Sequence, residues 1–231
     1  MKTTFPGFPK DLFDFLMALK RNNNREWFNA NKDRYKASVV APVTDFIIAM
    51  APRLNKISRH YVADPRANGG SMFRIYRDTR FSKDKSPYKT NVGCHFRHIA
   101  GKDAHAPGFY LHLAPGEIFF GGGVWKPPSS ILEKIRETIA DSPGEWRRIK
   151  ANKTFIRRFE QIKGERLKRP PRGYDKDHVN IEDLKLKSFF VLQNADKALA
   201  TSPAFINEVE RALKSASPLM RFLTYSIDLP F

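Results

Sequence analysis

The chain lacks most of the features that mark common protein classes. It contains one cysteine, Cys94, which excludes an internal disulfide and any zinc or iron–sulfur site built from several cysteines. Its best candidate for a membrane helix, DFIIAMAPRL, is shorter than the roughly 20 residues required and contains a proline. The first residues, MKTTFPGFPKDLFDF, show neither the apolar core nor the small-residue cleavage site of a signal peptide. We therefore expect a cytoplasmic protein that has no membrane partner.

Motifs of several well-known enzyme classes are also missing. The chain has no G-x-x-x-x-G-K-[ST] loop, no strand-linked G-x-G-x-x-G, no H-E-x-x-H and no G-x-S-x-G. His95 and His98 have the spacing of a metal-binding pair, but strand alternation points them to opposite faces. Three glycines, 121–123, precede a predicted helix, as in some phosphate sites; we favour a flexible turn that lets Trp125 pack. The sequence therefore indicates no metal and no cofactor.

Positive charge is what the chain has in excess. Its 41 Lys and Arg residues against 24 Asp and Glu give a formal net charge of +17. Such a surplus attracts polyanions, including nucleic acid and phosphorylated ligands, unless it serves solubility alone. The basic residues extend from Lys20 to Arg221 and do not gather in one tail or helix, which is less typical of a dedicated nucleic-acid binder. Charge leaves the partner open between an anionic small molecule and nucleic acid.

The period of the apolar residues divides the chain into three parts. Hydrophobic residues make up 41% of the chain and 19 residues are Phe, so a folded core is expected. Near-helical spacing covers 9–58, alternation with period two covers 71–122, and helical spacing returns over 129–228 with one further strand at LKSFFVLQ. We predict a single α+β domain over 1–231, in which an antiparallel β-meander sheet packs with N-terminal and C-terminal helices.

The predicted meander has four short strands, each with a core face and an outward face. In the first, SMFRIYRDTRF (71–81), Phe73, Ile75 and Phe81 are expected to point to the core. The other three lie in TNVGCHFRHI, GFYLHLA and IFFGG, and they alternate in the same way. The outward face of the first strand then carries charged and aromatic residues, namely Arg74, Tyr76, Asp78 and Arg80.

If the strands pair in order, polar groups of the outward face can converge on one ligand, because adjacent strands lie about 5 Å apart. Guanidinium and ammonium groups there suit a phosphate or a carboxylate. If the domain is an enzyme, Asp78 or His95 is predicted to act as the base. A slip of one residue in register would turn the set toward the core. The predicted ligand-binding residues are Arg74, Tyr76, Arg80, Lys85, Lys89, Arg97, Tyr110 and His112.

Four segments carry a resemblance to a known family: FPKDLFDFLMALKRNNNREWFNANKDRY, FRIYRDTRFSKDKSPYKTN, GFYLHLAPGEIFFGGGVWKPP and PRGYDKDH. In this order they resemble the bacterial and fungal family catalogued as Domain of Unknown Function 2461, over nearly the whole chain. The block R-D-x-R-F-S-x-D-K-x-P-Y-K is its most distinctive part. The resemblance implies a single-domain, soluble, conserved hypothetical protein, and it assigns no activity, ligand or catalytic residue.

Three hypotheses for the function follow from the sequence. The first, which we favour, is a domain that binds, or also acts on, a phosphorylated or carboxylated small molecule at the outward face of the meander. The second is a non-specific nucleic-acid binder that uses the total charge and exposed aromatic residues. The third is a structural or interaction protein without catalysis. The sequence does not choose between these hypotheses, and it does not give the oligomeric state.

Overall fold

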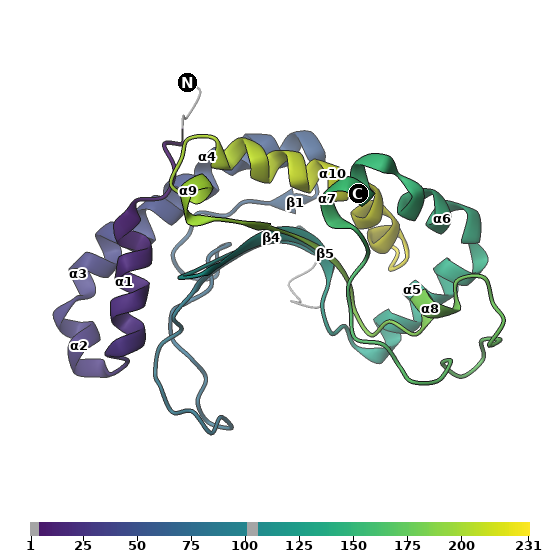
Figure 1. Ribbon diagram of the computed structural model, residues 1–231, viewed down its shortest axis with the longest axis horizontal. Helices are drawn as coiled ribbons and strands as arrows, with labels where there is room; N and C mark the ends of the chain where they lie inside the picture. Colours follow the sequence, from purple (N-terminus) through teal and green to yellow (C-terminus); the bar gives the residue numbers. More distant parts are fainter. Residues whose placement is uncertain (1–4, 101–105) are drawn as a thin grey trace.

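The computed structural model describes residues 5–100 and 106–231. Its centre is one antiparallel sheet in the order β1-β2-β3-β4-β5, so that neighbours in sequence are neighbours in the sheet. This arrangement, with helices packed on the sheet, confirms the expected α+β class (Figure 1). The strands are β1 (Tyr61–Val62), β2 (Val92–His98), β3 (Gly108–Ala114), β4 (Glu117–Val124) and β5 (Phe189–Ala195).

Helices cover one face of the sheet and flank its two ends. In Figure 1 the sheet is arched; α4 and α10 lie along its convex side, α1–α3 flank one end and α5, α6 and α8 flank the other. The N-terminal helices are α1 (Lys10–Arg21), α2 (Arg25–Ala30), α3 (Lys32–Tyr35), the π-helix η1 (Lys36–Val40) and α4 (Ala41–Ile57). The later helices are α5 (Ser129–Asp141), α6 (Pro143–Ala151), α7 (Lys153–Phe159), α8 (Ile181–Leu184), α9 (Lys197–Ala200) and α10 (Phe205–Tyr225).

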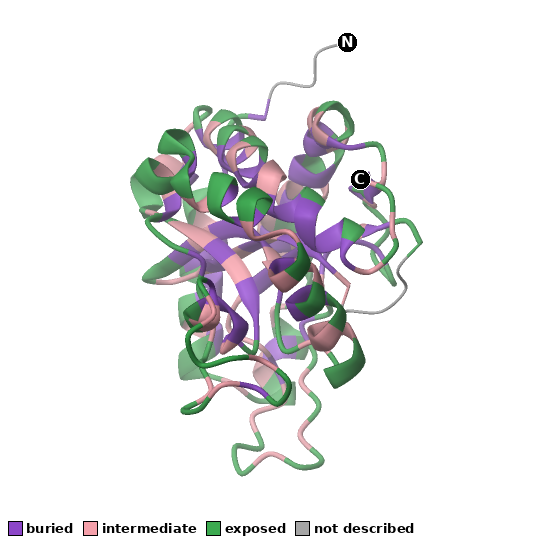
Figure 2. Cartoon of the chain, turned by 90° about the vertical axis from the view of Figure 1, so that its right-hand side faces the viewer, coloured by how far each residue is buried: buried purple, intermediate pink, exposed green. Residues whose placement is uncertain are grey.

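The core lies between the convex face of the sheet and the two long helices. Cys94, Phe96, Leu111 and Phe120 point to this side and are fully buried. Figure 2 shows the buried segments gathered in the strands and on the helix faces over them, while the loops on the other side are exposed. α10 packs on β4 and α4 through an apolar stripe at helical spacing. The concave face of the sheet therefore carries the opposite set of side chains.

Residues 32–57 form an almost continuous helical run, which is long and apolar enough by length and composition to cross a membrane. In the sequence, Pro42 and Pro52 interrupt the helical pattern of this run. Pro42 stands in the first turn of α4, directly after the π-helix η1, and Pro52 is accommodated inside the helix. Val43, Phe46 and other apolar residues of α4 are buried in the core.

The predicted first strand of the meander, residues 71–81, is not a strand: the sheet begins with the short β1 (Tyr61–Val62), and its next strand, β2, starts at residue 92. Only its first residues pair with β2: the Phe73 N–H donates to the Gly93 carbonyl at 2.9 Å, and Met72 bridges Cys94. Met72 is buried, so Phe73 turns to the concave side, and Phe81 is 95% exposed. The prediction was wrong because alternation fixes the orientation of a residue only where one face is buried.

After Phe73 the chain leaves the sheet and forms an irregular arm (residues 74–90), which projects on the concave side in Figure 1. A bridge between Tyr76 and Tyr88 joins its two limbs. Its base is fixed to the N-terminal helices, because Tyr88 stacks on Phe28 at 4.1 Å between centroids and its N–H and C=O both bond the Asn23 amide. The arm thus has a fixed base beside the concave face.

Candidate functional site

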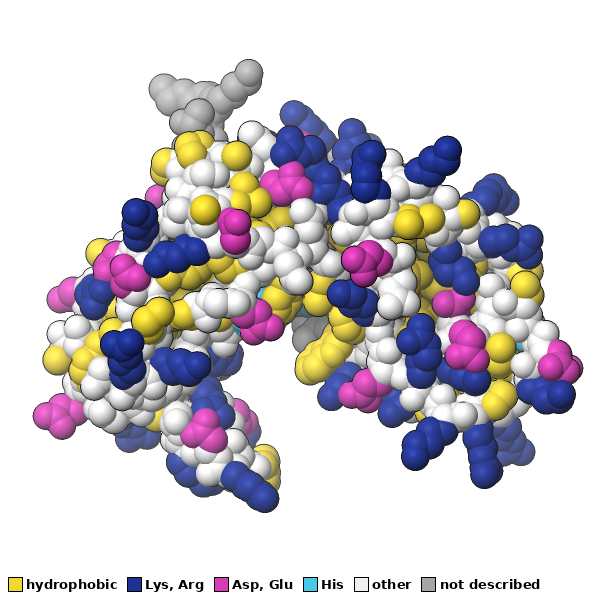
Figure 3. Space-filling view, viewed as in Figure 1, with side chains coloured by type: hydrophobic (Ala, Val, Ile, Leu, Met, Phe, Trp, Pro, Cys, Tyr) yellow, Lys and Arg dark blue, Asp and Glu magenta, His cyan; other side chains and the backbone are white. Residues whose placement is uncertain are grey.

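The concave face of the sheet forms the floor of the candidate site. No helix covers it in the described part of the chain, and Figure 3 shows the molecule hollowed under the arch, with hydrophobic side chains inside and Lys and Arg on the arms at either side. The strand register places its residues in three rows across β2, β3, β4 and β5. These rows are Arg97–Gly108–Gly123–Phe190, His95–Tyr110–Gly121–Leu192 and Gly93–His112–Phe119–Asn194.

One part of this face is an apolar hollow with a volume of about 550 Å³. This volume is in the range of small-molecule sites, which are concave and lined mainly by apolar and aromatic side chains. His95 adds a polar group. The side chains that form the hollow are Phe73, Tyr110, Phe119, Trp125, Phe190 and Leu192.

Glycines give the hollow its depth. Gly108 and Gly123 face each other across β3 and β4 and present no side chain to the cavity. A Cβ on Gly108 would collide with Nε2 of His95, and a Cβ on Gly123, whose φ is +145°, would collide with the backbone of β5. The floor is therefore fixed by the backbone, because neither position accepts a larger residue without movement of its neighbours.

The second part of the face is a basic groove with a volume of about 800 Å³, which lies between the base of the arm and the edge of β2. Two of its cations are already paired: Arg77 with Asp84, and Arg80 with Asp78. In the part of the chain that the structure describes, no carboxylate lies within 4 Å of the other three. Those three cations are Arg74, Lys89 and Arg97.

Phe73 belongs to both cavities and joins them. Its ring centroid is 5.6 Å from Nζ of Lys89 and 5.8 Å from Cζ of Arg97 on the side of the groove. On the side of the hollow it is 6.0 Å from the ring of His95 and 6.2 Å from that of Tyr110. Cations against an aromatic face are held by the ring quadrupole. The basic groove and the apolar hollow are thus two halves of one continuous surface.

The electrostatics of the groove favour an anion. Burial lowers the pKa of Lys89, and the positive charge of Arg74 lowers it further. Nζ of Lys89 donates to the backbone carbonyl of Arg74 at 2.9 Å, which keeps the two cations close together. A bound anion would relieve their repulsion and raise the pKa of Lys89 again.

His95 is a neutral hydrogen-bond donor in this structure. Nε of Arg97 donates to Nδ1 of His95 at 3.3 Å, so the ring proton must be on Nε2, which lies over Gly108 in the hollow. Burial, with the positive charge of Arg97 beside it, lowers the pKa of His95 to about 4. At neutral pH the ring is therefore uncharged and a weak base, which suits donation of a hydrogen bond better than proton transfer.

Asp78, the other predicted base, is not beside His95. It lies on the arm, lines the basic groove and binds Arg80 through two contacts, at 2.7 and 3.0 Å. The side-chain hydrogen bond from Arg80 lowers the pKa of Asp78. The two residues are held apart because the arm leaves the sheet after Phe73, where the predicted strand would have continued.

The structure divides the other predicted ligand-binding residues among different places. Tyr76 lines the groove with Arg74, whereas Lys85 is farther out on the arm and donates to the backbone carbonyl of Thr79. Tyr110 lines the hollow, and His112 lies behind it, with its Nδ1 3.4 Å from the Tyr110 hydroxyl. The structure thus brings together Arg74, Tyr76, Lys89 and Arg97 in the groove and His95 and Tyr110 in the hollow.

Most residues of the apolar hollow are not among those predicted from the sequence. Two Phe-Phe pairs, 119–120 and 189–190, carried the signal, because neighbouring residues of a strand point to opposite faces and one Phe of each pair must face away from the core. Trp125 was expected to pack, with the glycines before it in a turn. All three glycines lie in β4, two of them within the predicted strand IFFGG, and the indole is 65% exposed at the hollow.

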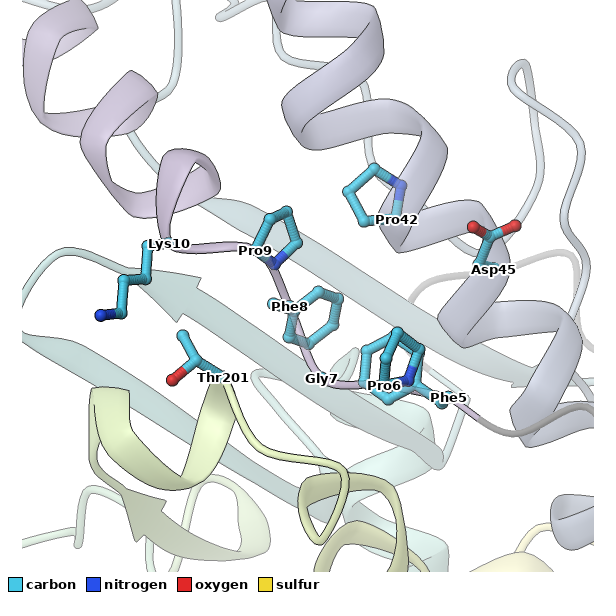
Figure 4. Close-up of a pocket in the computed structure, with 9 residues that line it drawn as sticks. All are labelled: Phe5, Pro6, Gly7, Phe8, Pro9, Lys10, Pro42, Asp45 and Thr201. Atoms are coloured by element: carbon cyan, nitrogen blue, oxygen red, sulfur yellow. The ribbon is translucent and has the colours of Figure 1, made fainter.

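A further cavity of about 410 Å³ lies at the N-terminal segment (Figure 4). This segment is packed down by apolar contacts: Phe8 is buried against Phe46 and donates its backbone N–H to the Ala200 carbonyl. In Figure 4 Lys10 and Asp45 lie at opposite ends of the cavity. Its polar groups do not converge, so we interpret it as a packing seam rather than a site.

Comparison with known proteins gives one finding. The model of the family described as "Conserved hypothetical protein (DUF2461)" matches residues 11–222. The comparison with curated proteins and the comparison with solved structures gave no match.

Proposed function

Because the chain belongs to the conserved hypothetical protein family DUF2461, whose description assigns no activity, we propose its function from the geometry of the concave face. The domain binds a small molecule that has a phosphate or carboxylate group and an apolar part. The anionic group occupies the basic groove, and the apolar part occupies the hollow. The observation that carries this proposal is the junction at Phe73, where the two cavities meet.

The charge of the groove supports an anionic ligand. Arg74, Lys89 and Arg97 converge there and have no carboxylate partner in the described residues. A guanidinium fork can hold a phosphate or a carboxylate through two parallel hydrogen bonds. Nε2 of His95 supplies a neutral donor where the hollow begins. These groups recognise an anion without the need for a metal ion.

The positions of the acid–base groups favour binding over turnover. Asp78 is engaged by Arg80 on the exposed arm, and His95 is uncharged in the hollow. A general base must reach the proton that it removes, and its pKa should lie near the working pH. Neither residue meets both conditions, so catalysis by Asp78 and His95 is the less favoured form of the proposal.

Nucleic-acid binding is the second candidate, and the Lys and Arg residues on the two sides of the arch favour it. Figure 3 shows Lys and Arg on both arms beside the hollowed face. Phe81 near the end of one arm is 95% exposed. A polyanion bound across both arms would contact many scattered cations, whereas a small anion would contact those of the groove.

Isothermal titration of pyrophosphate and citrate tests the proposal. We expect Arg74→Ala and Arg97→Gln each to weaken binding of pyrophosphate or citrate by about tenfold or more, since hydrogen bonds to charged groups contribute about 1.5–3 kcal/mol. The matched control is Lys214→Ala, an exposed cation on α10 at the opposite side of the sheet; it should leave binding unchanged. An equal loss in all three variants would overturn the proposal.

An oligonucleotide titration at several salt concentrations tests the second candidate. Nucleic-acid binding requires that log K fall with log salt by about 0.9 for each duplex phosphate neutralised. A steep slope together with a loss of affinity in Lys83→Ala, an exposed cation of the arm beside the concave face, would favour that candidate, and weak salt dependence would reject it.

A further inference from the structure

We propose that the apolar part of the ligand is a flat aromatic ring, which stacks beside Trp125 in the apolar hollow. This inference rests on the proposed function and adds the chemical class of the ligand: an aromatic phosphate or an aromatic carboxylate. Its basis is the position of Trp125, the shape of the hollow and the donor that His95 presents to it.

Trp125 is the least expected residue of the hollow. Its indole is 65% exposed although it lines an apolar cavity. The next residue, Lys126, has a φ of +47°, which non-glycine residues seldom adopt, and its N–H is fixed by the Ser188 hydroxyl at 2.9 Å. A constrained backbone that holds a large apolar ring in solvent is a common feature of binding sites.

The shape of the hollow suits a planar group. Its floor at Gly108 and Gly123 has no side chains, so a ring can approach the backbone of β3 and β4 closely. Phe190 and Leu192 of β5 border the floor on one side and Tyr110 on the other. Aromatic walls interact with a flat ring through offset or edge-to-face contacts, which a flexible alkyl chain cannot make.

His95 and Arg97 connect the ring to the anionic group. Nε2 of His95 carries a proton and lies over Gly108, so it can donate to an acceptor on the edge of the ring or to the atom that links the ring to its anion. Arg97, which fixes that tautomer, also lines the basic groove. One hydrogen bond therefore couples the neutral donor of the hollow to a cation of the groove.

The test compares four probes by isothermal titration: 1-naphthyl phosphate, n-octyl phosphate, 1-naphthol and pyrophosphate. We expect 1-naphthyl phosphate to bind at least about tenfold more tightly than n-octyl phosphate, which corresponds to about 1.4 kcal/mol. We also expect it to bind more tightly than 1-naphthol, which has the ring without the phosphate. The ring supplies the first difference and the anion supplies the second.

Variants of Trp125 assign the effect to the hollow. Trp125→Leu should weaken the binding of 1-naphthyl phosphate by about tenfold or more, in line with the range for stacking on an aromatic side chain. The affinity for pyrophosphate should not change. Trp125→Phe keeps a ring and should retain most of the affinity. The matched control is Tyr225→Leu at the end of α10, an aromatic side chain with 54% exposure; it should bind as the parent protein does.

The outcomes separate this inference from the proposed function. If n-octyl phosphate binds as tightly as 1-naphthyl phosphate, the aromatic class of the ligand is wrong. The same conclusion follows if Trp125→Leu binds 1-naphthyl phosphate as tightly as the parent protein does. In both cases an anion site in the basic groove can stand. If the affinity for pyrophosphate does not depend on Arg74 and Arg97, the proposed function itself falls, whichever organic probe binds.

Discussion

The buried, neutral state of His95 predicts a specific loss of stability in mild acid. Burial, with Arg97 beside the ring, lowers the pKa of His95 to about 4 in the folded protein, whereas an unfolded histidine titrates at about 6.5. Between these two values the unfolded chain binds more protons than the folded one. The free energy of unfolding must therefore fall as the pH decreases from 6.5 to 4.

The magnitude follows from linkage between protonation and folding. Relative to neutral pH, His95 alone should destabilise the fold by about 1 kcal/mol at pH 5.5 and by about 2 to 3 kcal/mol at pH 4.5. Other groups also titrate in this range; burial lowers the pKa of His112, although Glu117 partly opposes it. The comparison must therefore be made against a variant that differs only at residue 95.

The assay is urea denaturation of the parent protein and of His95→Gln at pH 7.5 and 5.5. Glutamine can still accept the hydrogen bond from Arg97 and does not titrate. The contributions of His112 and of the carboxylates to the pH dependence of stability are the same in both proteins and cancel in the comparison. The parent protein should lose about 1 kcal/mol more than the variant between the two pH values. Equal losses would mean that His95 is not held neutral, and they would remove the argument for its role as a donor.

Two further predictions concern the stability of the fold. Asp183→Ala should destabilise the protein by about 2–4 kcal/mol in urea denaturation, because the buried Nε1 of Trp146 donates to this carboxylate at 2.9 Å. The control is Glu165→Ala, which removes a side chain that is 68% exposed and should change the free energy of unfolding by less than about 0.5 kcal/mol. A similar effect of both substitutions would contradict the reasoning. Gly123→Ala should lower the thermal midpoint by several degrees, because its Cβ would collide with β5 at a φ of +145°. The control is Gly144→Ala in α6, where a Cβ meets no atom within 4 Å; it should leave the thermal midpoint unchanged or raise it slightly. An unchanged midpoint in Gly123→Ala would show that the floor of the apolar hollow can move.

The parts of the fold that burial enforces could be predicted from the sequence. β2 and β3 alternate between fully buried residues such as Phe96 and Leu111 and less buried ones such as His95, and this contrast gives a clear period of two. The placement of His95, Arg97 and Tyr110 on the face opposite the core follows directly from that period. The α+β class was predictable for the same reason.

The parts that burial does not enforce were misjudged. The segment 74–90 alternates in sequence, but only its base is buried, at Ile75 and Tyr88, whereas Phe81 farther out is 95% exposed. The bridge between Met72 and Cys94 of β2, with Met72 buried, set the orientation of Phe73 instead. Trp125 lies just beyond β4, where strand periodicity no longer determines the direction of a side chain. Half of the candidate site comes from such positions.

The two Phe-Phe pairs support the proposal that a ligand binds on the concave face. In each pair one ring lies in the core under the helices, as Phe120 and Phe189 do, and contributes to folding. The other, Phe119 or Phe190, lies on the face that no helix covers in the described chain, where burial of its apolar surface against protein is incomplete. A sheet face that served only solubility would carry polar side chains at these positions. Apolar rings, side-chain-free glycines and an adjoining groove of cations without carboxylate partners within 4 Å in the described chain therefore fit a bound aromatic anion better than solvent.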